Sequence, residues 1–290
     1  MPTYYKRDNT GTTNWNLATS WSTVSSTSST NTGTFPSSAT ADPVIFDSNS
    51  SNVTINVASA CTSITCTGYT GQITFTNSLS VRNNVSFSAG MTTTGTANLI
   101  ITGTSTLTSN GVQLSGGLEF APFTFSLTGT IADNWTIVGS LTRTGNGYTI
   151  AGSGGVRTIS VQGSFTGGLT INNITIRMTG TGNLSGGAGS GGGGSIEIDT
   201  AGTISHNGTF SLNGIVFTYI NGTFNSTPML TIAHLSLLIK GVITAILCSL
   251  LRSHKLLRVG INSSDASQYP ARESTAVAPC HTSTAPTASA

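Results

Sequence analysis

Apolar and polar residues alternate with a period of two along many short stretches of this chain. Val53, Ile55 and Val57 are separated by Thr54 and Asn56, which would point to the opposite side of a β-strand. Further apolar pairs are Val44/Phe46, Ile73/Phe75, Leu79/Val81, Val85/Phe87, Leu99/Ile101, Val112/Leu114, Leu118/Phe120, Phe123/Phe125/Leu127, Trp135/Ile137, Ile159/Val161, Leu169/Ile171, Ile174/Ile176, Ile196/Ile198, Phe210/Leu212 and Ile215/Phe217. Gly, Asn and Ser lie between them, so the pattern predicts many strands of about three to five residues joined by turns.

This spacing predicts an all-β fold, and an irregular parallel β-solenoid accounts for it best. Each coil would contribute two or three short strands and stack its inward Val, Ile, Leu and Phe side chains on the coil below. No repeat of fixed length is visible, so a β-sandwich remains an alternative. Because unpaired sheet ends promote aggregation, such a scaffold is expected to form a trimer or to cap its ends.

Four regions follow from these patterns. Residues 1–90 form an N-terminal β module, a cap with the first coils, and residues 91–228 form the solenoid body. Within the body, residues 186–194 read Gly-Gly-Ala-Gly-Ser-Gly-Gly-Gly-Gly, which predicts a flexible loop or hinge. Residues 229–259 form an apolar segment, expected to be helical, and residues 260–290 a disordered tail.

The apolar segment is centred on residues 230–251, and Arg252, Lys255 and Arg258 follow it. Its length and basic flank suit a transmembrane helix, but Lys240 near its middle costs roughly 2.5–3.5 kcal/mol on insertion. A membrane anchor, a helical assembly segment that binds a partner, and a slip of the reading frame after Met229 all remain open.

Charged residues make up only 7% of the chain, whereas Ser and Thr together number 91, so hydroxyl and amide groups must provide solubility. Residues 1–228 hold six bases and seven acids and therefore lack the basic footprint of a nucleic-acid-binding protein. The first eight residues contain no apolar run typical of a secretory signal peptide. We expect synthesis in the cytoplasm of the producing cell and release by another route, such as lysis.

Four cysteines form neither a disulfide framework nor a zinc site. Cys61 and Cys66 are close in sequence, while Cys248 and Cys280 are single and distant. Cys61 and Cys66 are predicted to be small buried side chains near a strand, with a local disulfide as the alternative. No cofactor and no metal ion is expected.

Candidate catalytic groups are few. Glu197 and Asp199, two residues apart on a predicted strand, would share one face, as the paired acids of a glycosidase require. An exposed strand face that carries two acids is the favoured interpretation, and a weak calcium contact is the lesser alternative. Asp42 and Asp47 would lie on opposite faces and are predicted to cap turns.

His206 is the only histidine in the first 228 residues, and it is expected to face solvent in a turn, so no catalytic triad can be assembled. Exposed aromatic side chains could bind sugars. Candidates by residue type are Tyr4, Tyr5, Trp15, Trp21, Tyr69, Trp135, Tyr148 and Tyr219. Trp15 and Trp21 are expected instead to anchor a small core at the N-terminal edge.

An ordered series of residues near the N-terminus carries a family resemblance. The series comprises Tyr4-Tyr5, Asn14-Trp15, Trp21-Ser22, Pro36, Asp42-Pro43-Val44-Ile45-Phe46-Asp47, Val53-Thr54-Ile55 and Cys61-Thr62-Ser63-Ile64-Thr65-Cys66-Thr67-Gly68. It resembles the N-terminal module of tail fibres and related virion structural proteins of tailed bacteriophages, which also occurs in large bacterial surface proteins. The match covers about the first 90 residues. Pro43 replaces a second acidic residue of the family, and the residues after Met229 have no counterpart in it.

The resemblance implies a β-rich, homotrimeric fibre component of the virion that contacts other virion proteins and a host cell-surface glycan or protein. It supplies no catalytic residue. We therefore expect a non-enzymatic structural protein of a phage particle, part of a tail fibre, that contributes to host-surface recognition by multivalent contact. The alternatives are a tailspike-like polysaccharide depolymerase and a bacterial surface adhesin anchored by the C-terminal apolar segment.

Overall fold

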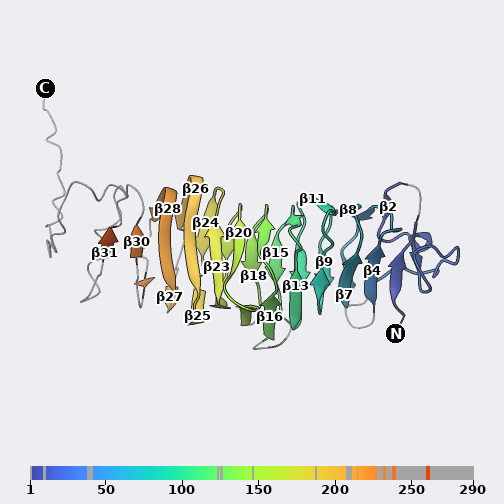
Figure 1. Ribbon diagram of the computed structural model, residues 1–290, viewed down its shortest axis with the longest axis horizontal. Coiled ribbons are helices and arrows are strands. Elements are labelled where there is room, and N and C mark those ends of the chain that lie inside the picture. The colour runs from blue at the N-terminus through green and yellow to red at the C-terminus, as the bar shows by residue number, and fades with distance from the viewer. Residues whose placement is uncertain are drawn as a thin grey trace, which may run out of the picture.

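The protein is an all-β solenoid whose coils stack along one axis (Figure 1). The computed structural model describes residues 2–8, 11–37, 42–122, 124, 127–145, 147–186, 188–206, 211–213 and 215–226, together with 231–232, 237–239 and 259–261. Stacked turns of parallel strands form the rod, which confirms the predicted solenoid over the sandwich. Among the described residues, one short 3-10 helix, η1 (Ala18–Ser20), interrupts the strands.

Most coils contribute one strand to each of three faces, which we number in chain order. Face 1 is an unbroken ladder of strands. Its members are β1 (Tyr4–Lys6), β4 (Pro43–Asp47), β7 (Ser63–Thr67), β10 (Val85–Ser86), β13 (Ser105–Thr108), β16 (Leu127–Ile131), β19 (Tyr148–Gly152), β22 (Leu169–Asn172), β25 (Ala188–Gly192), β27 (Ser211–Asn213) and β29 (Thr231–Ile232). β3 (Trp21–Ser22) runs antiparallel to β1 and ends this ladder.

Face 2 is formed in two parts. The first part contains β2 (Thr13–Asn14), β5 (Val53–Ile55), β8 (Gln72–Phe75) and β11 (Thr92–Gly95). The second part contains β14 (Gln113–Leu114), β17 (Trp135–Ile137), β20 (Arg157–Val161), β23 (Ile174–Met178), the first half of β26 (Ser195–His206), and the start of β28 (Val216–Ser226), followed by β30 (Leu237–Ile239) and β31 (Val259–Ile261).

Face 3 is continuous, and the long strands β26 and β28 join it to face 2 at their second halves. Its other members are β6 (Ser59–Cys61), β9 (Leu79–Val81), β12 (Leu99–Ile101), β15 (Leu118–Phe120), β18 (Leu141–Arg143), β21 (Phe165–Thr166) and β24 (Gly182–Ser185).

The strand register explains why no fixed repeat is visible in the sequence. On face 1, Val44 pairs with Ile64, Ile64 with Val85, and Val85 with Leu107, which are steps of 20, 21 and 22 residues. Leu107 then pairs with Ile131, 24 residues further along the chain. The inward column stays aliphatic while the turns vary in length, because stacking requires only that the inward side chains match.

The corner between faces 2 and 3 depends on glycine. A Cβ atom on Gly139 would lie 2.6 Å from the main-chain carbon of Gly116, and one on Gly163 would lie 2.6 Å from the Gly139 carbonyl oxygen. Successive coils therefore approach closely at this corner, which only a residue without a side chain permits.

Asparagine carboxamides link consecutive coils at other corners. Asn52, Asn84, Asn134 and Asn172 each accept, through Oδ1, a main-chain N–H from the following coil at 2.8–2.9 Å. These bonds satisfy main-chain donors where the strand ladder stops, which accounts for the abundance of Asn between the strands.

The N-terminal cap is an aromatic cluster that covers the first coil. Trp15 packs edge-on against Trp21, with 4.8 Å between their ring centroids, and Trp21 packs edge-on against Phe46, with 6.1 Å between theirs. The ring centroids of Phe46 and Tyr69 are 5.2 Å apart. The indole N–H of Trp15 donates to the Pro36 carbonyl, and that of Trp21 donates to the Trp15 carbonyl. The two tryptophans are core residues of the cap, as expected.

One expectation needs correction. The glycine-rich segment contains a strand, because β25 pairs with β22 through main-chain hydrogen bonds that need no side chain, while Ala188 fills the inward position. In the apolar segment and at the start of the tail, the described residues 231–232, 237–239 and 259–261 form β29, β30 and β31, which extend the parallel ladders. The remaining residues of that segment and of 260–290 lie outside the described part of the chain.

Candidate functional site

The ladder of face 2 is interrupted between β11 and β14. β11 ends the four-stranded sheet, and β14 begins the long sheet that continues along the same face. The same two coils remain paired on face 1, through β10 and β13, and on face 3, through β12 and β15. The interruption is therefore local to one face of the rod.

Thr93 occupies the interruption. Its register partners are Ile73 and then Val53, so Thr93 stands at an inward position that is aliphatic in the two preceding coils. Its Oγ1 donates to the Gln113 carbonyl at 2.8 Å and accepts the Ser115 N–H at 2.8 Å. A side-chain hydroxyl thus takes main-chain groups that a neighbouring strand would otherwise pair.

A groove of about 430 Å³ opens beside this hydroxyl. Its buried lining includes Met91, Thr93 and Val112, whereas Gln113 and Val138 are exposed at the surface. No ionisable side chain lines the groove among the described residues. The volume falls within the roughly 300–1,000 Å³ typical of small-molecule sites.

One wall of the groove is a turn held by the next coil. The Asp133 carboxylate accepts the N–H groups of Ser109 at 2.8 Å and Asn110 at 2.6 Å, and also the Ser109 hydroxyl at 3.0 Å. The Asn110 carboxamide donates to the Phe87 carbonyl at 2.6 Å. Asn110 and Gly111 have positive φ, as a tight turn requires. These hydrogen bonds within the protein hold the turn in place without a ligand.

Rows of hydroxyl groups form a second candidate surface on face 1. Thr128, Thr149 and Thr170 are register partners on three consecutive coils and point outward, half-buried or exposed. A second row on earlier coils joins Thr65, Ser86 and Thr108. Neighbouring strands lie about 4.7–4.9 Å apart, so each row repeats one chemical group at that spacing.

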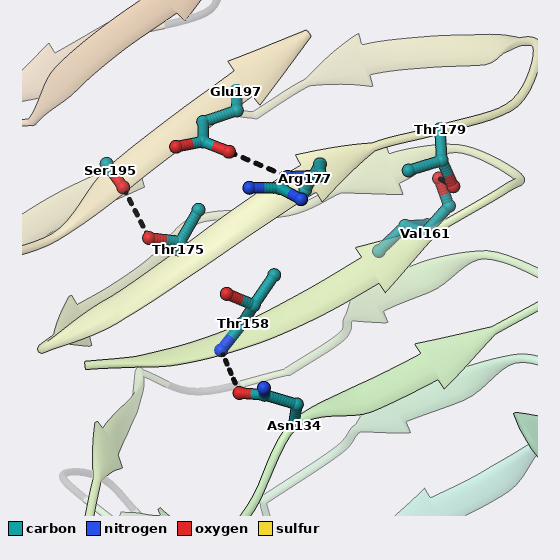
Figure 2. A network of polar contacts seen from close by, with 8 residues as sticks. All are labelled: Asn134, Thr158, Val161, Thr175, Arg177, Thr179, Ser195 and Glu197. Atoms are coloured by element: carbon teal, nitrogen blue, oxygen red, sulfur yellow. Dashed lines mark hydrogen bonds and ion pairs between the residues drawn. The ribbon is translucent and has the colours of Figure 1, made fainter. Parts of the chain in front are cut away.

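The outward side of face 2 beyond the groove carries mixed polar ladders (Figure 2). Thr175 and Ser195 share a hydroxyl hydrogen bond of 2.7 Å across β23 and β26. Beside them, Arg177 Nε donates to Glu197 Oε2 at 2.7 Å (Figure 2). These side chains bond to one another along the rod axis.

The predicted acid pair lies where the sequence placed it. Glu197 and Asp199 both point outward on β26, but Glu197 is ion-paired with Arg177, and the register of β26 shifts beside Asp199. Asp47 caps a turn, accepting the Asn49 N–H at 2.9 Å, and Asp42 accepts the Ser37 N–H at 2.9 Å. Both of the latter carboxylates have structural roles in the first coils.

The expectation for His206 was wrong. His206 ends β26 at an inward position, paired in register with Leu184, and its side chain is fully buried. Burial lowers its pKa because the charged imidazolium loses its hydration.

The aromatic candidates for sugar binding are mostly core residues. The buried members are Tyr4, Trp15, Trp21, Tyr69, Trp135 and Tyr148. Tyr5 is half-buried, and the side chain of Tyr219 lies outside the described part of the structure. These buried rings fill the interior of the rod and cannot stack on an external sugar.

Cys61 and Cys66 are buried free thiols, as predicted, and no disulfide joins them. Burial raises the pKa of Cys66 to about 12 and raises that of Cys61 as well, because a thiolate would be poorly solvated there. The thiols are therefore unreactive at neutral pH.

The groove was not predicted, although the sequence contained a signal for it. Thr92-Thr93-Thr94 places a hydroxyl at the position where the alternation calls for an aliphatic side chain. The Asn110-Gly111 pair is typical of a turn and by itself indicates nothing more. Only the stacking of coils shows that these two segments are adjacent.

Within the described ranges, no group of three or more His, Cys, Asp or Glu side chains could hold a metal ion. The same ranges contain no helix that is long and apolar enough to cross a bilayer. The fold thus defines the class, a parallel β-solenoid. Comparison of the chain with protein-family models, curated proteins and solved structures found no match.

Proposed function

We propose that this protein is a non-enzymatic structural component of a phage particle, part of a tail fibre, that contributes to host-surface recognition by multivalent contact. The observation that carries this proposal is the repetition of outward hydroxyl groups along a rod, as in the row Thr128, Thr149 and Thr170. The N-terminal residue series supports the assignment to a phage particle by resemblance.

Repetition favours avidity over tight binding at one site. Each hydroxyl contributes a weak contact, but many linked contacts raise the effective concentration and hold a particle on a surface. Assembly into a trimer, which we include in the proposal, would multiply these contacts threefold.

Glu197 and Asp199, the acid pair on β26, support the depolymerase alternative less well than the hydroxyl rows support the structural role. A retaining or inverting glycosidase needs one carboxyl group that can be protonated as general acid. Glu197 accepts a hydrogen bond from the Arg177 guanidinium, so this carboxylate is already engaged in an ion pair. Asp199 lies beside it on the strand.

The proposal is tested with the purified full chain on a panel of bacterial strains and their capsular polysaccharides. We expect saturable binding to cells of at least one strain, a trimeric mass by analytical ultracentrifugation, and no new reducing ends or unsaturated sugars after incubation with capsule. Turnover that disappears in Glu197→Gln and Asp199→Asn would establish the depolymerase instead.

The adhesin alternative is tested by removing residues 229–290. We expect the shortened chain and the full chain to fractionate alike when expressed in bacteria. Loss of the protein from the membrane fraction on truncation would favour a C-terminal anchor.

A further inference from the structure

We propose that the groove between β11 and β14 binds one neutral saccharide unit of a surface glycan. The inference rests on the proposed function for its biological setting, but the site is argued from its own geometry. It is the one place in the described ladders of faces 1, 2 and 3 where adjacent coils lose their strand pairing.

The groove is built in advance of a ligand. Thr93 holds Gln113 and Ser115 from one side, and Asp133 holds the turn at Asn110 from the other. Met91 is fixed as well, since its Sδ accepts the Ser88 N–H at 3.4 Å. A site that is already ordered avoids the entropy cost of ordering its walls on binding.

The lining matches the two kinds of surface that a sugar ring presents. Met91 and Val112 supply buried apolar area, and exposed Val138 extends it to the surface. The exposed Gln113 side chain has both a carbonyl acceptor and an amide donor, and Thr92, which carries a hydroxyl, is also exposed. A pyranose has apolar C–H faces and hydroxyl groups that both donate and accept hydrogen bonds.

The absence of charged side chains from the described lining of the groove disfavours ionic ligands. Among the described residues that line it, none carries a charge, and the Asp133 carboxylate behind the turn is occupied by three hydrogen bonds. An anionic sugar would lose hydration without gaining a counter-charge. Neutral hexoses and N-acetylhexosamines are therefore the expected class.

The test measures binding of the full chain to immobilised neutral oligosaccharides of hexose and N-acetylhexosamine, beside uronate-containing and sulfated oligosaccharides. We expect binding to at least one neutral oligosaccharide, followed by isothermal titration calorimetry with that compound. Gln113→Ala should weaken affinity about tenfold, the effect of losing one hydrogen-bonding group, and Val138→Trp should abolish binding by filling the opening.

Matched controls use exposed residues of the same type away from the groove. Gln162→Ala and Val156→Trp should bind like the wild type, since both residues are exposed and neither lines the groove. Unchanged thermal unfolding of all four variants confirms that they are folded. Equal binding by wild type, Gln113→Ala and Val138→Trp would overturn the inference, as would binding to the charged oligosaccharides alone.

Cell binding separates this inference from the proposed function. If the wild type binds cells and Val138→Trp binds them equally well, recognition occurs elsewhere on the rod and the groove is not its site. If the groove binds neutral oligosaccharides but the wild type binds no cells, the saccharide site stands and host recognition is refuted. Failure of the wild type to bind any neutral oligosaccharide rejects the groove proposal directly.

Discussion

Faces 1 and 2 differ in their strand pairing between two consecutive coils, the one that contains β10 and β11 and the one that contains β13 and β14. On face 1, β10 pairs with β13 in a ladder that continues along the rod, whereas on face 2, β11 and β14 are unpaired. The inward residues of face 1 here are Val85 and Leu107, whereas those of face 2 are Thr93 on β11 and Leu114 on β14. The comparison shows that the partner of an inward hydroxyl differs between the two faces. Thr93 bonds to main-chain groups of the next coil where the ladder is open, whereas inward Ser105 on face 1 bonds to the Tyr148 hydroxyl and its strand stays paired.

The largest expected effect on the free energy of unfolding comes from removing part of a buried side chain on face 1, whose ladder is continuous. Ile150 is fully buried on β19, and Ile150→Ala should lower the free energy of unfolding by about 2–5 kcal/mol through lost burial and a cavity. Met91→Ala, beside the groove, should cost less, because its surroundings are already open on one side. Urea unfolding measures both, and equal losses would contradict the contrast between the faces.

The next effect tests the hydroxyl itself. Thr93→Val keeps the shape of the side chain but leaves the Gln113 carbonyl and the Ser115 N–H without their partner, so we expect a loss of about 1–3 kcal/mol. Thr94→Val is the matched control on the same strand. Thr94 is half-buried and points outward, where its hydroxyl bonds to that of Thr74, and its loss should be smaller. A larger loss in the control would refute the role assigned to Thr93.

The ionisation of Lys6, on β1 near the N-terminal end of face 1, provides a test by pH. Lys6 is buried on β1, its Nζ donates to Ser51 Oγ at 2.8 Å, and burial together with the Arg7 charge lowers its pKa to about 8. The unfolded chain retains this proton until about pH 10.5, so between the two values the unfolded state binds more protons and stability rises with pH. The slope is at most about 1.4 kcal/mol per pH unit.

Measuring this slope requires a difference between two proteins, because the buried thiols act in the opposite direction. Cys66 ionises more readily in the unfolded chain, so its contribution falls as pH rises above about 9. Wild type should gain stability relative to Lys6→Met between pH 7.5 and 9 in urea unfolding. Parallel pH profiles would show that Lys6 is not desolvated in the folded state.

The smallest effect concerns the carboxamide links between coils. Asn134 Oδ1 accepts the Thr158 N–H at 2.9 Å in an exposed position (Figure 2). Water can replace this acceptor, so Asn134→Ala should cost about 0.5 kcal/mol. A loss as large as that of Thr93→Val would mean that corner links, and not the ladders, dominate the stability of face 2.

Much of the fold was predictable from alternation alone. The pairs Val53/Ile55, Ile73/Phe75 and Ile159/Val161 all supply buried residues, because a strand with one buried face needs an apolar residue at every second position. The glycine-rich strand β25 was not predictable, since its ladder is made by the main chain and leaves no side-chain signal. The burial of His206 was not predicted, because the following Asn207-Gly208 indicates a turn that would include His206.

The sequence by itself determined the strand content, the outward hydroxyls and the burial of Trp15, Trp21 and the two cysteines, because these depend on local alternation and side-chain chemistry. The tertiary structure alone decided which positions about 20 residues apart become neighbours. Coil length is set by turns whose lengths vary, so the meeting of Thr93 with Gln113, and the groove that results, follows only from how the coils stack.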